Sequence, residues 1–106
     1  MRTPPESDWR LLSQNKDRIL HEACDRIISD ASALLAAPHS SPHAKHLALY
    51  KLVTSRDEAL GRMFNDWKRS NFYPLLVRLV TEKIINPVDL ESYSEETQAV
   101  VSQLLE

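Results

Sequence analysis

Glycine is almost absent from this chain, since Gly61 is the only one among 106 residues. Hairpin turns between strands and phosphate-binding loops usually need glycine, because only glycine adopts positive φ angles at little cost. The alternation of apolar and polar residues that is typical of strands is also missing. We therefore predict an all-α protein. The chain lacks a glycine-rich phosphate loop, a nucleophile elbow and a His-Glu-x-x-His motif, so we predict that it is not an enzyme and has no catalytic residues.

Cysteine and long apolar runs are equally scarce. Cys24 is the only cysteine, which excludes an intrachain disulfide, whereas a secreted protein of this size usually carries several. The purely apolar runs are a few residues long, far below the roughly 20 residues needed to cross a bilayer. The charged segment after Met1 does not have the pattern of a secretory leader. We expect a cytoplasmic protein with no membrane partner.

The four histidines do not form a recognisable metal site. They are His21, His39, His43 and His46. A structural zinc site needs four ligands, but Cys24 lies on another predicted helix and no acid stands four residues from His43 or His46. We expect solvated histidines, no metal and no cofactor.

The first predicted helix is long. Ser7 and Asp8 have the pattern of a helix start, and Pro38 cannot continue a helix, so we predict one helix of about 30 residues, roughly 45 Å, ending near Ala37. Its apolar stripe follows alternating spacings of four and three residues: Leu20, Cys24, Ile27, Ala31 and Leu34, widened by Ile19, Ala23, Ile28 and Leu35. Residues 1–7 are predicted to be a flexible N-terminus.

A second helix is predicted after a short polar link. Ser41 is a capping residue and Pro42 occupies the first helical position. One broad apolar face follows: Leu49, Leu52, Val53, Leu60, Met63, Phe64 and Trp67. Ser55 and Glu58 have the spacing of a capping box, so the helix either restarts there or runs through, and we favour one continuous helix.

Two further helices are predicted in the last third of the chain. Asn71 caps the third, Pro74 lies in its first turn, and it ends at Asn86 and Pro87. Apolar residues cover nearly all of its faces, so we expect it to be the most buried. A single turn follows over residues 87–91, and Ser94 caps the last helix. The prediction is a small antiparallel bundle of four helices, or five if a segment is divided, forming one domain over residues 8–106.

Charge is distributed unevenly, although the net charge is only −2. Residues 39–83 carry eight basic and four acidic side chains, a net charge of +4, whereas residues 84–106 carry five acids and no base. These segments either neutralise each other in the fold or leave a basic surface for a polyanion.

Six residues are candidates for binding: Arg56, Arg62, Asp66, Trp67, Arg69 and Tyr73. Arg56 interrupts an apolar face, so it needs a carboxylate such as Asp25 or an acid of the tail, or else an anionic ligand. By spacing, Arg62, Asp66 and Arg69 form one helical stripe, typical of a salt-bridged surface. The aromatic residues near Lys68 and Arg69 either pack in the core or stack on nucleic-acid bases.

The apolar stripe of the first helix is wider than one neighbouring helix covers. This surplus predicts binding to another protein or to a second copy of the chain, in the role of an adaptor, inhibitor or regulatory factor. The alternative is a nucleic-acid-binding regulator that uses the basic segment 39–83. A helix-turn-helix at Asn71 fits less well, because the residues after it are too apolar for an exposed recognition helix.

Overall fold

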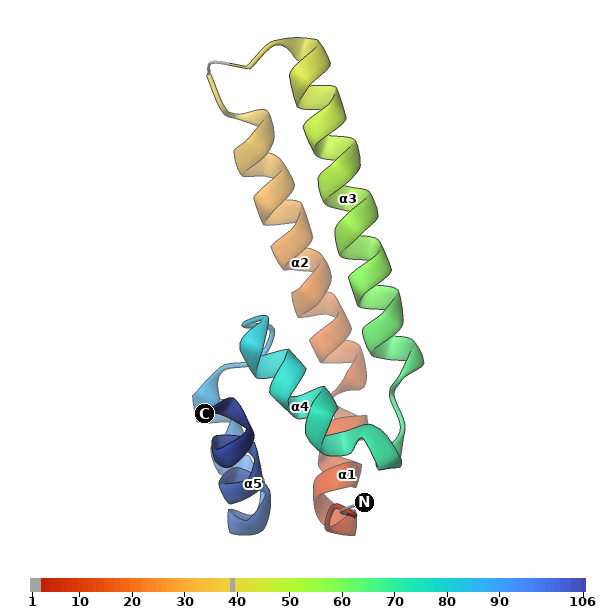
Figure 1. Ribbon diagram of the computed structural model, residues 1–106, viewed down its shortest axis with the longest axis vertical. Coiled ribbons are helices and arrows are strands. Elements are labelled where there is room, and N and C mark those ends of the chain that lie inside the picture. The colour runs from red at the N-terminus through yellow and green to blue at the C-terminus, as the bar shows by residue number, and fades with distance from the viewer. Residues whose placement is uncertain (1–2, 39) are drawn as a thin grey trace. The chain divides into compact units, whose positions relative to one another are not determined.

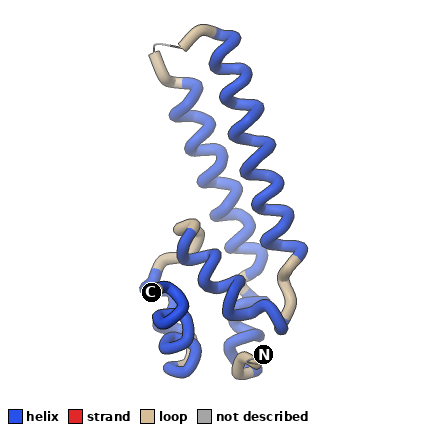
Figure 2. Tube along the Cα trace, viewed as in Figure 1, coloured by secondary structure: helices blue, strands red, loops and turns tan. Residues whose placement is uncertain are grey.

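The computed structural model describes residues 3–38 and 40–106, and within these ranges all regular structure is helical, without a strand. Five α-helices and two 3₁₀ helices follow one another (Figure 2): α1 (Glu6–Gln14), α2 (Lys16–Leu35), α3 (Pro42–Asn65), η1 (Arg69–Asn71), α4 (Phe72–Thr81), η2 (Pro87–Ser92) and α5 (Glu95–Leu105). The all-α prediction is confirmed.

The helices gather into two compact units. Unit 1 contains the residues up to Leu20 together with Asp66–Glu106, and unit 2 is His21–Asn65. Helix α2 begins in the first unit and continues into the second. The predicted flexible N-terminus over residues 1–7 and single domain over residues 8–106 stay predictions, although α1 already begins at Glu6.

The prediction of one long first helix is wrong, because Asn15 separates α1 from α2. Its backbone N–H donates to the carbonyls of Leu11 and Leu12, and its side-chain Nδ2 donates to the Leu11 carbonyl at 2.8 Å. Arg18 Nε donates to Asn15 Oδ1 at 3.3 Å. An Asn side chain that bonds to nearby backbone groups favours the end of a helix over its continuation.

The core of unit 1 is built around α4. This helix buries five residues, more than any other helix in the part of the chain that is described: Phe72, Tyr73, Leu75, Leu76 and Leu79. Phe72 makes edge-to-face contacts with three rings, at centroid distances of 6.4 Å to Trp9, 5.1 Å to Tyr73 and 6.1 Å to Tyr93. The expectation that this helix is the most buried is confirmed.

A buried carboxylate joins α1 to the start of α5. Asp8, only 3% exposed, accepts hydrogen bonds from Ser94 N at 3.0 Å, Ser94 Oγ at 2.6 Å and Thr97 Oγ1 at 2.5 Å. Ser94 Oγ accepts in turn from Thr97 N at 3.2 Å, which confirms the predicted cap of the last helix. A carboxylate at the positive end of a helix is favoured by the helix dipole as well as by these donors.

Helix α4 begins directly after Asn71, as predicted, but it ends earlier than predicted. It ends at Thr81 rather than near Asn86, because Lys83 adopts φ 61° and the N–H groups of Ile84 and Ile85 both donate to the Leu79 carbonyl. Such a left-handed residue commonly terminates a helix. Asn71 precedes the helix but does not cap it, since its Nδ2 donates to the Asp66 carbonyl at 3.1 Å.

Unit 2 is a hairpin of two long helices, with residues 21–35 of α2 beside α3 (Figure 1). Helix α3 begins at Pro42, and Ser41 Oγ accepts a hydrogen bond from Ala44 N at 3.1 Å, as predicted for this cap. The helix runs without interruption through Ser55 to Asn65, which confirms the continuous alternative. The seam between the helices is only half-buried, and no described residue from 24 to 62 is buried.

Candidate interaction surface

The six residues predicted for binding fall in both units. Arg56 and Arg62 lie on α3 in unit 2, whereas Asp66, Trp67, Arg69 and Tyr73 belong to unit 1. The predicted helical stripe of Arg62, Asp66 and Arg69 does not form, because α3 ends at Asn65 and the chain turns before η1 begins. Spacing arguments for shared faces hold only while the helix continues.

Arg56 pairs with a carboxylate inside the hairpin. Its Nη1 lies 2.7 Å from Asp30 Oδ2, and the two side chains are 36% and 48% exposed. The partner is therefore neither Asp25 nor an acid of the C-terminal tail. The pair joins α2 to α3.

The predicted residues in unit 1 make contacts within that unit. Arg69 Nη2 lies 2.8 Å from Glu6 Oε1, and the Lys16 ammonium lies 5.5 Å from the centre of the Trp67 ring. Tyr73 is 95% buried by area, with its ring against Phe72. These contacts favour the packing interpretation of the basic and aromatic residues over an exposed stacking platform.

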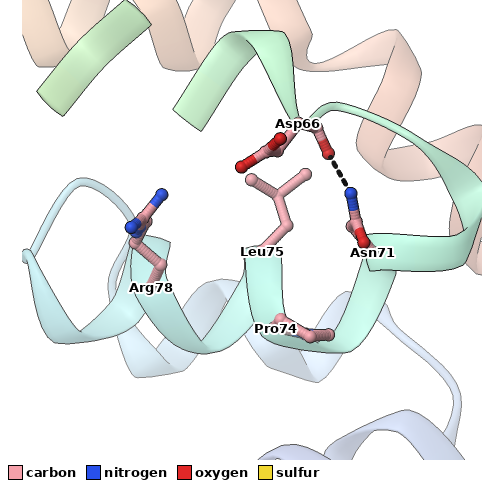
Figure 3. Close-up of a pocket in the computed structure, with 5 residues that line it drawn as sticks. All are labelled: Asp66, Asn71, Pro74, Leu75 and Arg78. Carbon is pink, nitrogen blue, oxygen red and sulfur yellow. Dashed lines mark hydrogen bonds between the residues drawn. The ribbon is translucent and has the colours of Figure 1, made fainter. Parts of the chain in front are cut away.

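A polar groove of about 430 Å³ lies beside the start of α4 (Figure 3). The side chain of Arg78 lies on one side of Leu75 and that of Asn71 on the other, with Asp66 above Leu75 and Pro74 below it in this view. The described residues of this lining offer one carboxylate and one guanidinium.

A second groove, of about 460 Å³, runs between α4 and α5 and is more apolar. Tyr73, Pro74, Val100 and Leu104 contribute most of its apolar lining, and Leu104 is 54% exposed. The Tyr73 hydroxyl is buried and has no hydrogen-bond partner among the described residues. A buried hydroxyl usually finds a partner, yet this one is covered by protein and does not reach the groove surface.

Several large apolar side chains of the hairpin are exposed to solvent. Ile28 and Tyr50 are 62% and 64% exposed, and Leu35 and Val53 are 49% and 43% exposed. Each of the four follows, by one position, a half-buried residue of the seam: Ile27, Leu34, Leu49 and Leu52. We call Ile28, Leu35, Tyr50 and Val53 the apolar face.

These four residues lie on one side of the hairpin. Each step along an α-helix turns the side chain by about 100°. In two helices that run in opposite directions, the position after a seam residue therefore falls on the same side of the pair in both helices. The positions before the same seam residues carry Arg26, Ala33, Ala48 and Lys51, so the opposite side has no large apolar residue. Leu47, 44% exposed, lies three residues before Tyr50 on the same helix and therefore borders the apolar face.

Charge separates along the length of the hairpin. The tip half, residues 31–56, contains Lys45, Lys51 and Arg56 but no Asp or Glu, a net charge of +3. The base half, residues 21–30 and 57–65, has a net charge of −3, from five acids (Glu22, Asp25, Asp30, Asp57 and Glu58) against Arg26 and Arg62. The hairpin as a whole is neutral.

No metal centre is assembled by the residues that the structure places. They contain no group of three or more histidine, cysteine or acidic side chains suited to a metal ion. His21, His43 and His46 lie exposed on α2 and α3, while His39 lies outside the described residues. Within the same ranges, no helix has the length and apolar character needed to cross a membrane.

No protein-family model, curated protein or solved structure matches this chain. The site therefore rests on its own geometry. The sequence did indicate that Ile28 and Leu35 widen the stripe of the first helix, but it did not single out Tyr50. Residues 31–56 are a run of 26 residues without any acid, and this run could have identified the tip half from the sequence.

Proposed function

We propose that this chain acts by binding protein, through the apolar face of the α2–α3 hairpin, as a non-enzymatic cytoplasmic adaptor, inhibitor or regulatory factor. The observation that carries the proposal is the apolar face itself. Four large apolar side chains share one side of a helix pair in which no described residue from 24 to 62 is buried. Single exposed apolar residues are ordinary, but a contiguous group on one side marks an interaction surface.

The energetics support an additional layer of protein against this side. Covering apolar surface contributes about 25 cal/mol per Å² removed from water. Two helices alone leave much of their apolar surface half-exposed, whereas helices packed in two layers cover it on both sides. The bundle expected from the sequence is completed, in this proposal, by helices of the partner.

Nucleic-acid binding through residues 39–83 is the alternative. The acid-free tip half supports it, because a basic surface attracts phosphates. Two observations weigh against it: Arg56 and Arg69 are already paired with Asp30 and Glu6, and the base half of the same hairpin is acidic. Salt-sensitive retention on heparin and a mobility shift of random duplex DNA would favour this alternative over protein binding.

Site-specific photo-crosslinking tests the proposal. We expect a photoreactive benzoylphenylalanine in place of Tyr50 to give adducts with protein when the source cells are irradiated. The same group in place of Lys51, which lies on the opposite side of the hairpin, is the control and should give far fewer. Equal adducts at both positions, or none at position 50, would contradict binding through the apolar face.

A further inference from the structure

We propose that unit 1 binds a small apolar α-amino acid, of about the size of leucine, in a cavity where the end of α1 and the first turn of α2 face η2. The cavity has a volume of about 250 Å³. The residues that line it all belong to unit 1, so this site is separate from the apolar face. The inference therefore goes beyond the proposed function and does not depend on it.

The floor of the cavity is apolar. Ile19 and Ile85 are 1% and 3% exposed, and Leu11 adds a half-buried side chain. Arg18 and Ser92 are exposed members of the lining and lie at its mouth. An apolar cavity of roughly 150 Å³ is enough for benzene, so this one holds a ligand of about ten non-hydrogen atoms. Leucine has this size.

Arg18 supplies a positive charge to the cavity, and Asn15 helps to hold it there. Arg18 Nε donates to Asn15 Oδ1 at 3.3 Å, while Asn15 Nδ2 donates to the Leu11 carbonyl at 2.8 Å. A guanidinium has five N–H donors in a planar fork, so it can bind a carboxylate in addition to its contacts within the protein. The break between α1 and α2 therefore places an anion-binding group at the cavity.

Asp89 supplies the opposite charge from the other side of the cavity. Its side chain is half-buried, and its Oδ2 accepts a hydrogen bond from Asn86 N at 2.9 Å, which holds it at the start of η2. Oδ1 takes no part in that bond. A carboxylate oxygen is a strong acceptor for an ammonium group, so Asp89 can bind the amine of a ligand.

Tyr93 brings the two charged groups into one place. It is 8% exposed and lines the same cavity, and burial raises the pKa of its hydroxyl to about 12. The charge of Arg18 lowers this pKa and that of Asp89 raises it, so both charges lie near the Tyr93 hydroxyl. At neutral pH the hydroxyl keeps its proton and can donate a hydrogen bond to a bound carboxylate.

The pair of opposite charges determines the class of ligand. A carboxylic acid without an amine would bind Arg18 but would bring a like charge toward Asp89. An amine without a carboxylate would bind Asp89 but would bring a like charge toward Arg18. An α-amino acid carries both charges at one end and an apolar side chain at the other, which matches two charged groups above an apolar floor.

Titration of the full chain with L-leucine, followed by NMR of the backbone amides, tests the site. We expect saturable shifts concentrated in residues 11–19 and 85–93, with a dissociation constant of about 0.1–1 mM for so small a ligand. Isocaproate lacks the ammonium group of leucine and isoamylamine lacks its carboxylate, so both should bind at least about tenfold more weakly. No saturable shift up to about 10 mM L-leucine, or equally tight binding of either analogue, would overturn the proposal.

Two charge variants test the roles of the side chains. Arg18→Gln should weaken L-leucine binding at least about tenfold but strengthen that of isoamylamine, because a like charge has been removed. Asp89→Asn keeps an oxygen that can accept from Asn86 N, and it should weaken L-leucine binding but strengthen that of isocaproate. A variant that merely disturbs the structure would not gain affinity for the opposite analogue.

Matched controls remove exposed charges outside the lining. Arg10→Gln and Asp17→Asn should bind L-leucine as the wild type does. Ser92→Trp fills the mouth of the cavity and should abolish binding while the NMR spectrum of α4 remains that of the wild type. Wild-type affinity for L-leucine in Arg18→Gln, Asp89→Asn or Ser92→Trp, or no gain for the opposite analogue, would overturn the proposal.

Discussion

Asp8 is a single residue that contributes strongly to the stability of unit 1. It is buried and accepts three hydrogen bonds from Ser94 and Thr97, on a helix 86 residues further along the chain. Asp8→Ala leaves these donors without an acceptor, and we expect it to lower the free energy of unfolding by about 3 kcal/mol. Urea denaturation followed by circular dichroism measures the change.

Two further variants test whether the loss of stability comes from the hydrogen bonds of Asp8. Asp17→Ala removes an exposed acid from the first turn of α2 and should change the stability by less than about 0.5 kcal/mol. Asp8→Asn keeps one acceptor oxygen, so its loss of unfolding free energy should lie between those of Asp17→Ala and Asp8→Ala. An Asp8→Ala protein as stable as the wild type would show that the hydrogen bonds across α1 and α5 do not form in solution.

Tyr93 should make unit 1 less stable at alkaline pH. Burial raises the pKa of Tyr93 to about 12, and the nearby charge of Asp8 adds to the increase. The unfolded chain releases this proton near pH 10, so between pH 10 and 12 it binds fewer protons than the folded chain. After allowance for solvent screening, the raised pKa contributes about 1–2 kcal/mol to the free energy of unfolding. This contribution is complete below pH 10 and is lost as the pH rises from 10 to 12.

Tyr93→Phe isolates this effect from the other groups that titrate at high pH. The Phe ring keeps the contact with Phe72 but carries no hydroxyl to ionise. The difference in unfolding free energy between wild type and variant should therefore shrink or reverse from pH 9 to pH 11.5, in favour of the variant. A difference that does not change with pH would contradict the raised pKa.

At the scale of elements, the start of α3 depends on one serine. Ser41 Oγ accepts the hydrogen bond of Ala44 N at the first turn, where the backbone N–H groups have no partner inside the helix. Ser41→Ala should lower stability by about 1 kcal/mol, measured by thermal and urea unfolding. Ser40→Ala, one residue earlier and outside the cap, should be close to neutral, and equal losses would contradict the role of the cap.

Several element boundaries were predictable because a local chemical group creates each one. Pro42 after Ser41 starts α3, Ser94 starts α5, and Pro87 starts a short 3₁₀ turn. The break at Asn15 was missed although residues 13–18 are all polar, because apolar residues recur at helical spacing after that run. The side-chain bond from Asn15 to the Leu11 carbonyl shows where α1 ends. The early end of α4 depends on a positive φ at Lys83, a residue type that gives no signal for it.

On the scale of the whole molecule, the two units should differ in local stability. Unit 1 has the buried core around α4, whereas the hairpin has no buried residue in the described part of the range 24–62. We expect amide protons of residues 24–62 to exchange at least about tenfold faster than those of α4, measured by hydrogen exchange at low protein concentration. Equal protection in both units would contradict this difference.

The candidate site was only partly predictable. Apolar spacing identified Ile28 and Leu35 as surplus to one neighbouring helix, and this led to the expectation of a protein partner. Arg56 was recognised as a charge that needs a partner, but the choice of Asp30 depends on the register of α2 against α3. Tyr50 was missed because its exposure of 64% depends on which side of α3 faces α2, which no local pattern encodes.

The sequence by itself determined that the chain is helical, where α3 and α5 begin, and that the two halves of the hairpin carry opposite charge, because each of these depends on residue type or on neighbours a few positions away. The tertiary structure decided the burial of Asp8, the pairing of Arg56 and the position of the apolar face. These depend on residues distant in sequence that come together only when the helices pack, and the free energy of that packing is a sum over contacts that no local pattern specifies.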